Sequence, residues 1–181
     1  MKIEIISGSP RKESISYRVA LFLQKELSSK TNHHVGLIDV RDWNLGLQNQ
    51  VFKNVETTPE EFKPLAERIF AANAFILVTP EYNGSYTAAL KNLLDHFPKQ
   101  SRKAFGLVTS STGALGGMRC AQQLLLLVAG LFGIASPHLM ITSFTDKRFD
   151  TEGNSVDETF AKPVENFINE FVWLAESINS K

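Results

Sequence analysis

Short, almost uniformly apolar segments alternate with longer amphipathic segments along the whole chain. A run such as Ala74–Thr79 has the composition of a strand that helices cover on both faces, whereas the longer segments repeat their apolar residues at helical spacing. This alternation predicts an α/β fold with a parallel sheet. Strands are expected at Lys2–Ser7, His34–Asp39, Ala74–Thr79, Ala104–Ser110 and Pro137–Thr142. Helices are expected at Ser14–Ser29, Pro59–Asn73, Ser85–Phe97, Gly117–Phe132 and Asp157–Ile178.

The pattern predicts a single domain over residues 1–181 with five strands and five helices, since no repeat, low-complexity tract or linker interrupts it. Two irregular stretches remain, Arg41–Thr57 and Ser143–Asn154. Long loops in a compact domain are often functional or lie at contacts between subunits.

The loop between the first strand and the first helix has the residues of a phosphate site. Ligands of open α/β sheets bind beyond the carboxyl ends of the strands. The loop region contains hydroxyls, a glycine and a cation at Ser7, Gly8, Ser9, Arg11, Ser14 and Ser16. Backbone N–H groups and the positive helix end attract an anion, and hydroxyls donate further hydrogen bonds to it. The GxxxxGK(S/T) and GxGxxG patterns are absent, which favours a terminal monophosphate. The alternative is an ordinary serine-capped turn.

The loop after the third strand, Thr79–Ser85, suits a flat heterocycle. Pro80 forces an extended backbone before it, and Asn83-Gly84 permits a sharp turn with positive φ. Tyr82 is available for stacking, and the final serine is able to cap the next helix. An ordinary turn is again the alternative.

The loop after the fourth strand, Ser110–Arg119, contains glycines that let the backbone approach a planar ligand. The helix that follows would place partial positive charge where a reduced flavin carries negative charge. Since the strands end at one edge of the sheet, the three loops together predict a phosphate clamp and two walls for a flat ring. FMN is the mononucleotide cofactor that this combination favours.

Charge and composition narrow the possible partners. Lys+Arg and Asp+Glu both number 19, so the zero net charge gives no reason to expect nucleic acid or an anionic membrane. The longest apolar run, Leu124–Ala135, is interrupted by glycine and too short to cross a bilayer. Cys120 is the single cysteine, and the four histidines lack metal-ligand spacing. The charged beginning of the chain is unlike a signal peptide, so a cytoplasmic location is expected.

Two motifs connect the chain to a known family. Gly8–Ser14 reads GSPRKES, similar to a GSxRxxS phosphate loop, and Pro80–Ser85 reads PEYNGS, similar to a flavin loop that Ala89–Asn92 continues. With these motifs the chain resembles the NADPH-dependent FMN reductases of the flavodoxin-like superfamily, a group with quinone, chromate and azo-dye reductases. The resemblance covers nearly the whole chain.

This resemblance implies a flavodoxin-like three-layer sandwich with a five-stranded parallel sheet in the order 2-1-3-4-5, and a homodimer or dimer of dimers. It implies bound FMN and NADPH or NADH as electron donor. The phosphate would be held by Ser9, Arg11, Ser14 and Ser16. The isoalloxazine ring would be lined by Pro80, Glu81, Tyr82, Asn83 and Gly84, and its pyrimidine end by Ser111, Thr112, Gly113 and Gly116.

Two positions depart from the family pattern. Ser16 stands where many relatives have Asn, and its hydroxyl remains a donor. Tyr86-Thr87 replaces a small apolar residue and a proline beside the ring, which affects substrate shape more than cofactor binding.

The predicted function is an FMN-dependent NAD(P)H oxidoreductase. A nicotinamide would give a hydride to flavin N5, and the electrons would pass to a quinone, a similar small acceptor or free flavin. No catalytic side chain and no metal are expected. One alternative is an FMN-binding electron-transfer module without NAD(P)H activity, although such carriers are typically acidic. A binding domain without flavin is another. The roles of Glu81 and Arg119 stay open.

Overall fold

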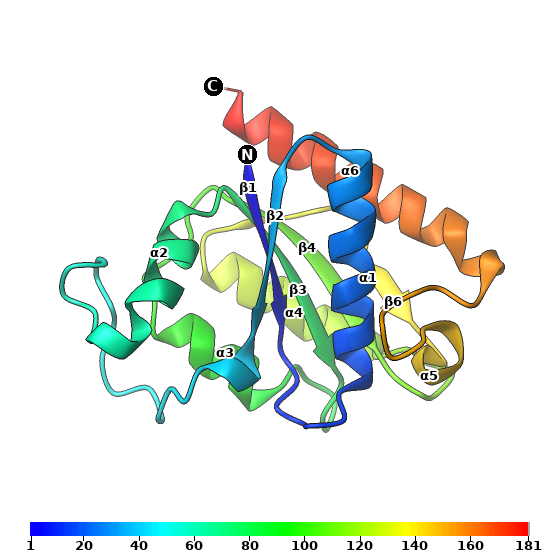
Figure 1. Ribbon diagram of the computed structural model, residues 1–181, viewed down its shortest axis with the longest axis horizontal. Helices are drawn as coiled ribbons and strands as arrows, with labels where there is room; N and C mark the ends of the chain where they lie inside the picture. The colour runs from blue at the N-terminus through cyan, green and yellow to red at the C-terminus, as the bar shows by residue number, and fades with distance from the viewer. Residues whose placement is uncertain (181) are drawn as a thin grey trace.

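The structure is a computed structural model and describes residues 1–180. Its centre is a parallel sheet in the order β2-β1-β3-β4-β5, and a sixth strand, β6, also pairs with β4 (Figure 1). The strands are β1 (Lys2–Ser7), β2 (His34–Asp39), β3 (Ala74–Pro80), β4 (Ala104–Ser110), β5 (Ile134–Ala135) and β6 (Met140–Thr142). The predicted parallel sheet and its strand order are confirmed.

The last strand differs from the prediction of one continuous segment at Pro137–Thr142. β5 pairs with the beginning of β4, and β6 pairs with its end, so two short strands share one edge. The N–H of Ser136 still donates to the carbonyl of Phe105 at 2.7 Å. Pro137 has no N–H group, and the ladder therefore stops there.

Helices cover both faces of the sheet and give the predicted three layers (Figure 1). They are α1 (Ile15–Lys30), α2 (Lys63–Ala71), α3 (Ala88–Asp95), α4 (Met118–Gly130), α5 (Thr145–Arg148) and α6 (Ala161–Asn179). α1 and α6 pack on one face, and α2, α3 and α4 pack on the other. The five predicted helices correspond to α1 to α4 and α6. The short α5 makes six among the described residues, and it lies in the stretch predicted to be irregular.

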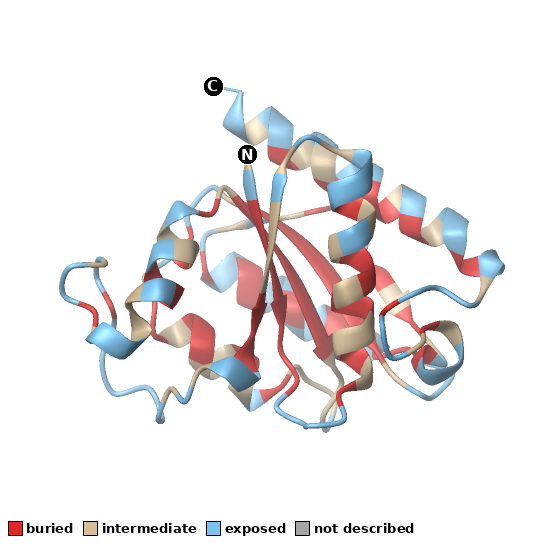
Figure 2. Cartoon of the chain, in the orientation of Figure 1, coloured by how far each residue is buried: buried red, intermediate tan, exposed pale blue. Residues whose placement is uncertain are grey.

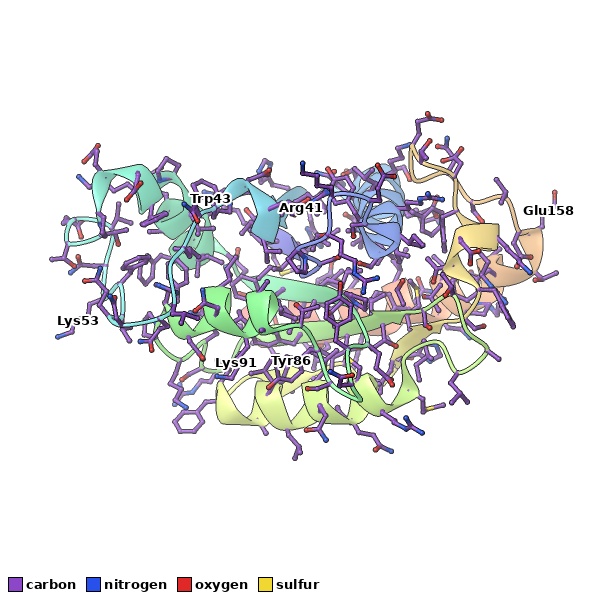
Figure 3. All side chains as sticks on the ribbon, turned by 90° about the horizontal axis from the view of Figure 1, so that it is seen from below. Arg41, Trp43, Lys53, Tyr86, Lys91 and Glu158 are labelled. Atoms are coloured by element: carbon purple, nitrogen blue, oxygen red, sulfur yellow. The ribbon has the colours of Figure 1, made fainter. Side chains whose placement is uncertain are left out.

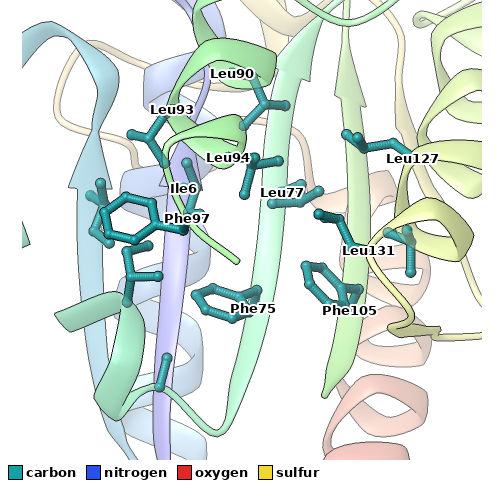
Figure 4. Packing of buried hydrophobic residues seen from close by; sticks show 14 of the residues in the cluster. Ile6, Phe75, Leu77, Leu90, Leu93, Leu94, Phe97, Phe105, Leu127 and Leu131 are labelled. Atoms are coloured by element: carbon teal, nitrogen blue, oxygen red, sulfur yellow. The ribbon is translucent and has the colours of Figure 1, made fainter. Parts of the chain in front are cut away.

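Each central strand contributes to two hydrophobic cores. In β3, Phe75 and Leu77 pack against α2, α3 and α4, whereas Ile76 and Val78 pack on the side of α1 and α6. These side chains are fully buried, and the strands form the buried centre of Figure 2. The rings of Phe75 and Phe105 stack with their centres 5.3 Å apart, and the leucines of α3 lie over the same face (Figure 4).

Apolar burial changes to polar burial at the carboxyl ends of the strands. Ser7, Thr79 and Ser110 are buried hydroxyl residues at the ends of β1, β3 and β4. The Oγ of Ser7 has no hydrogen-bond partner among residues 1–180. In β3 and β4 the buried polar side chains thus lie at the carboxyl ends of the strands.

Gly106 in β4 has no room for a Cβ atom, which would lie 2.9 Å from Cζ of Phe167 and 3.1 Å from Cδ2 of Phe171. We expect Gly106→Ala to lower the free energy of unfolding by about 1–3 kcal/mol, because overpacking displaces these rings. Urea unfolding followed by circular dichroism measures the change. Gly46→Ala is the control, since a Cβ atom there meets nothing within 4 Å. If the two substitutions lowered the free energy of unfolding equally, crowding around Gly106 would not be the cause.

Candidate functional site

A pocket of about 180 Å³ lies at the carboxyl ends of β1, β3 and β4. It is formed by the first loop (residues 8–14), the second loop (residues 81–87) and the third loop (residues 111–117), together with the adjoining ends of the strands and of α1. Nine residues predicted from the sequence line it, namely Ser9, Arg11, Ser14, Ser16, Pro80, Glu81, Tyr82, Ser111 and Thr112. The three loops singled out in the sequence therefore do meet in one place.

The first loop brings buried hydroxyls to the start of α1. Ser14 is the N-cap residue, and its Oγ accepts a hydrogen bond from the N–H of Tyr17 at 3.1 Å. The Oγ atoms of Ser14 and Ser16 lie 3.2 Å apart, and Ser9 is also buried. Hydroxyl hydrogens are free to turn toward an anion, and the helix end adds partial positive charge. This donor set fits a terminal phosphate.

Gly8 has a packing role rather than a flexible one. Its N–H donates to the carbonyl of Val78 at 2.8 Å, and the hydroxyl of Thr87 donates to its carbonyl. A Cβ atom at this position would lie 2.9 Å from Cβ of Leu90 in α3. Glycine is required because the first loop passes directly under α3.

The second loop contains the predicted tight turn. Asn83 and Gly84 have φ values of +52° and +81°, and Tyr82 and Ser85 exchange backbone hydrogen bonds of 2.8 and 3.1 Å across them. Ser85 belongs to the turn and does not cap α3, contrary to the prediction. Thr87 is the cap instead, and its hydroxyl accepts a hydrogen bond of 3.1 Å from an N–H in the first turn of α3.

Tyr82 connects the second loop to the first. The guanidinium carbon of Arg11 lies 4.8 Å from the centre of the Tyr82 ring, a cation–π contact. This is the ring that the sequence predicted would stack on a flat heterocycle. The Tyr82 hydroxyl is buried and has no hydrogen-bond partner in the described part of the chain. A buried unpaired hydroxyl is costly, so a ligand that supplied a partner would be stabilised there.

Glu81 joins the second loop to α4. Its Oε2 accepts hydrogen bonds from the N–H groups of Arg119 and Cys120 at 3.1 and 3.2 Å. The N-cap residue of α4 is Gly117, which has no side chain to cap the helix. Glu81 therefore caps α4 from another loop, and its charge is stabilised by the helix dipole. Two N–H groups of the helix end predicted to face a reduced flavin are thus bonded to this carboxylate.

The third loop is held by the segment that contains β6 and α5. A Cβ atom on Gly116, where φ is +61°, would lie 2.7 Å from Cγ2 of Ile141. The N–H of Thr145 donates to the carbonyl of Ser111 at 3.1 Å. The hydroxyl of Ser111 accepts from the N–H of Gly113 at 3.0 Å. Crowding against β6 thus explains Gly116, and the same contacts fix Ser111 at the pocket.

Four predicted site residues shape the loops without lining the pocket, namely Asn83, Gly84, Gly113 and Gly116. Three residues that were not predicted do line it, namely Glu13, Ile15 and Ser110. All three lie in loop regions identified from the sequence, and Ser110 is also the last residue of β4. Their place in these loops was the available signal.

Other reactive side chains have structural partners. Nδ1 of His96 lies 2.7 Å from the carbonyl oxygen of Asn92, and Nε2 of His33 lies 3.0 Å from a carboxylate oxygen of Glu176. Burial raises the pKa of the Cys120 thiol to about 12, so it is protonated at neutral pH. Residues 1–180 contain no His, Cys, Asp and Glu cluster suited to a metal ion. None of the helices in this range has the length and apolar character needed to span a membrane.

Sequence comparison places the chain among known flavoenzymes. A family model for NADPH-dependent FMN reductase matches residues 1–146. The chain belongs to the NADPH-dependent FMN reductase family. The family predicted from the two loop motifs is confirmed. The predicted FMN cofactor, NAD(P)H donor and oxidoreductase class are those of this family and of its relatives.

An NAD(P)H-dependent FMN reductase of Schizosaccharomyces pombe is 34% identical over 128 residues, which span 68% of this chain and 63% of that protein. The chain thus matches less than two thirds of the length of this relative. A quinone reductase of Escherichia coli K12 is 33% identical over 132 residues, 68% of each protein. The flavoenzyme NAD(P)H:(acceptor) oxidoreductase FerB of Paracoccus denitrificans has the same fold, with a TM-score of 0.79, 22% identity and 97% coverage of both chains.

The role of Glu81 as a helix cap predicts the effect of its removal. We expect Glu81→Ala to lower the free energy of unfolding by about 0.5–2 kcal/mol, since two N–H groups of α4 lose their acceptor. Glu81→Gln keeps an acceptor oxygen, so we expect a smaller decrease in its free energy of unfolding. Chemical unfolding of the two variants measures the difference. Glu13→Ala removes an exposed carboxylate from the same pocket and serves as control. Wild-type stability of Glu81→Ala would rule out the capping role.

Proposed function

We propose that the chain binds FMN in the pocket between the three loops and uses NAD(P)H to reduce a quinone, a similar small acceptor or free flavin. The observation that carries this proposal is the group of buried hydroxyls at the start of α1, beside the cation of Arg11. Family membership supports the same cofactor and reaction class. The proposal includes action as one domain in the cytoplasm, where reduced nicotinamides are available.

The residues of the chain would position the cofactor. When bound, FMN supplies hydride acceptance at N5 and onward electron transfer. Hydrogen bonds to the phosphate would come from Ser9, Ser14 and Ser16, with Arg11 balancing its charge. Pro80, Glu81, Tyr82, Asn83 and Gly84 would shape the wall beside the ring, and Ser111, Thr112, Gly113 and Gly116 would border the pyrimidine end. Because Glu81 is bonded to α4, its part would be to hold the second loop in place.

Reduction of the bound flavin tests the proposed activity. Protein reconstituted with FMN is expected to be yellow, to bleach when NADPH or NADH is added without oxygen, and to regain its colour when a quinone is added. Absorbance spectra record each step. A protein that binds FMN but is bleached by neither nicotinamide would be an electron-transfer module. A protein that remains colourless after incubation with FMN would contradict the cofactor assignment.

We also propose that the chain forms a homodimer, or a dimer of dimers, through the outer face of α4. Large apolar side chains on or beside this helix are 40–68% exposed, namely Leu115, Met118, Leu125, Leu126 and Phe132. Exposed apolar patches of this kind mark contact surfaces. The helix begins next to the pocket, where Glu81 caps it. A second copy on this face would therefore stand at the edge of the cofactor site.

Leu126→Glu tests this contact, because it places a charge in the centre of the proposed interface. We expect its molar mass, from light scattering during size-exclusion chromatography, to correspond to fewer chains than the wild type. Trp173→Glu is the matched control, since Trp173 is 60% exposed on α6, in the opposite helix layer. A wild-type protein that elutes as a single chain would contradict the dimer.

A further inference from the structure

Arg41 connects the end of β2 to the first loop. Its Nε donates to the carboxylate oxygens of Asp39 at 3.0 and 2.9 Å, and its Nη2 also donates to Asp39. Its Nη1 donates to the carbonyl oxygens of Lys12 and Arg11 at 2.8 and 3.4 Å. The guanidinium carbon of Arg41, a residue labelled in Figure 3, lies 4.5 Å from the centre of the Tyr17 ring in α1. One side chain thus links three parts of the chain around the phosphate side of the pocket.

This linkage is charged and mostly buried. The side chain of Asp39 is only 5% exposed and that of Arg41 is 26% exposed. A carboxylate buried this far requires a fixed, well-aligned partner, and the planar guanidinium supplies it bidentately. The hydrogen bonds with Asp39 raise the pKa of Arg41. Each guanidinium nitrogen has a partner within the protein, and Arg41 is not among the residues that line the pocket.

The bonds to Arg41 orient the peptide groups of the first loop. In a planar trans peptide the N–H points away from the C=O. Holding the carbonyls of Arg11 and Lys12 against Arg41 therefore directs the N–H groups of Lys12 and Glu13 away from it. Glu13 lines the pocket, as do the next three residues of the chain. Successive N–H groups turned to one side form an anion-binding concavity.

We propose that Arg41, anchored by Asp39, is a positioning residue that holds the first loop in its phosphate-binding shape without touching the phosphate. The inference rests on the proposed binding of FMN. It assigns the phosphate selectivity of the site to a residue two positions after the end of β2, outside both loop motifs. Its specific consequence is that loss of the tether weakens binding of a flavin with a phosphate and leaves a flavin without one unaffected.

General stabilisation is the competing explanation, and the chain contains a matched control for it. Arg68 of α2 donates from Nε and Nη2 to the carboxylate of Glu4 at 3.1 and 2.5 Å. The side chain of Glu4 is 6% exposed, almost the same as that of Asp39. This pair joins α2 to β1, and neither residue lines the pocket. Arg68→Lys therefore imitates the chemical change of Arg41→Lys without altering the first loop.

The experiment compares FMN with riboflavin, which lacks the phosphate. Each flavin is titrated with four deflavinated proteins, namely wild type, Arg41→Lys, Arg68→Lys and Arg11→Ala. Quenching of flavin fluorescence gives the Kd. Lysine keeps the positive charge of Arg41 but cannot bond to Asp39 and both loop carbonyls together. We expect Arg41→Lys to raise the Kd for FMN about tenfold, the value of a charge-assisted hydrogen bond, and to change the Kd for riboflavin less than about twofold. Arg68→Lys should leave both constants within about twofold of wild type.

The outcomes separate this inference from the proposed function. If Arg11→Ala loses FMN affinity and Arg41→Lys does not, the phosphate site stands and the positioning role is wrong. If Arg41→Lys weakens both flavins equally, or Arg68→Lys weakens FMN as much, the effect is general stability and the inference is also overturned. If wild type binds neither flavin, the proposed function itself fails.

Discussion

The central strands β3 and β4 are buried on both faces, because helices cover each side of the sheet. Along most of their length only apolar side chains can be accommodated, since a polar group there would lose water without gaining a partner. At the carboxyl ends the covering helices give way to loops, and hydroxyls such as Thr79 and Ser110 replace the apolar residues. Parallel strands bring all of these ends to one edge. The site is located there as a consequence of how the core is covered.

The three loops depend on one another for their shape. The hydroxyl of Thr87 in the second loop bonds to Gly8 in the first. Glu81 bonds to α4 at the end of the third loop, and Thr145 bonds to Ser111 within it. Each of these contacts joins segments more than 30 residues apart. The geometry of the pocket is therefore set by tertiary contacts, although each loop could be recognised locally.

Local patterns predicted the elements well, and contacts between distant residues explain the differences. β1, β2 and β4 have the predicted bounds, and each ends at a serine or aspartate that follows branched apolar residues or threonine. Pro137 breaks the last strand, which the apolar pattern alone did not show. Glycines could be recognised in the loops from the sequence. The need for glycine at positions 8 and 116 comes from a neighbouring helix and a neighbouring strand, which leave no room for a Cβ atom.

The roles of charged residues that bond to distant parts of the chain are also hard to predict from the sequence. Nothing in the spacing along the chain indicates that Arg41 bonds to the first loop or that Glu81 caps α4, because these pairs are 29 and 38 positions apart. The hydroxyls at the start of α1 were recognisable because they are close together in sequence. Functional groups that act directly are thus easier to predict here than the groups that support them.

The divided edge of the sheet also affects how copies of this chain can associate. β5 has two residues and β6 has three, with Pro137 between them. A long unpaired edge would present a continuous row of N–H and C=O groups on which a strand from another molecule could grow. This edge is too short and too interrupted to act as such a template. Growth of a cross-β fibril from this side of the molecule is therefore disfavoured by the native backbone itself.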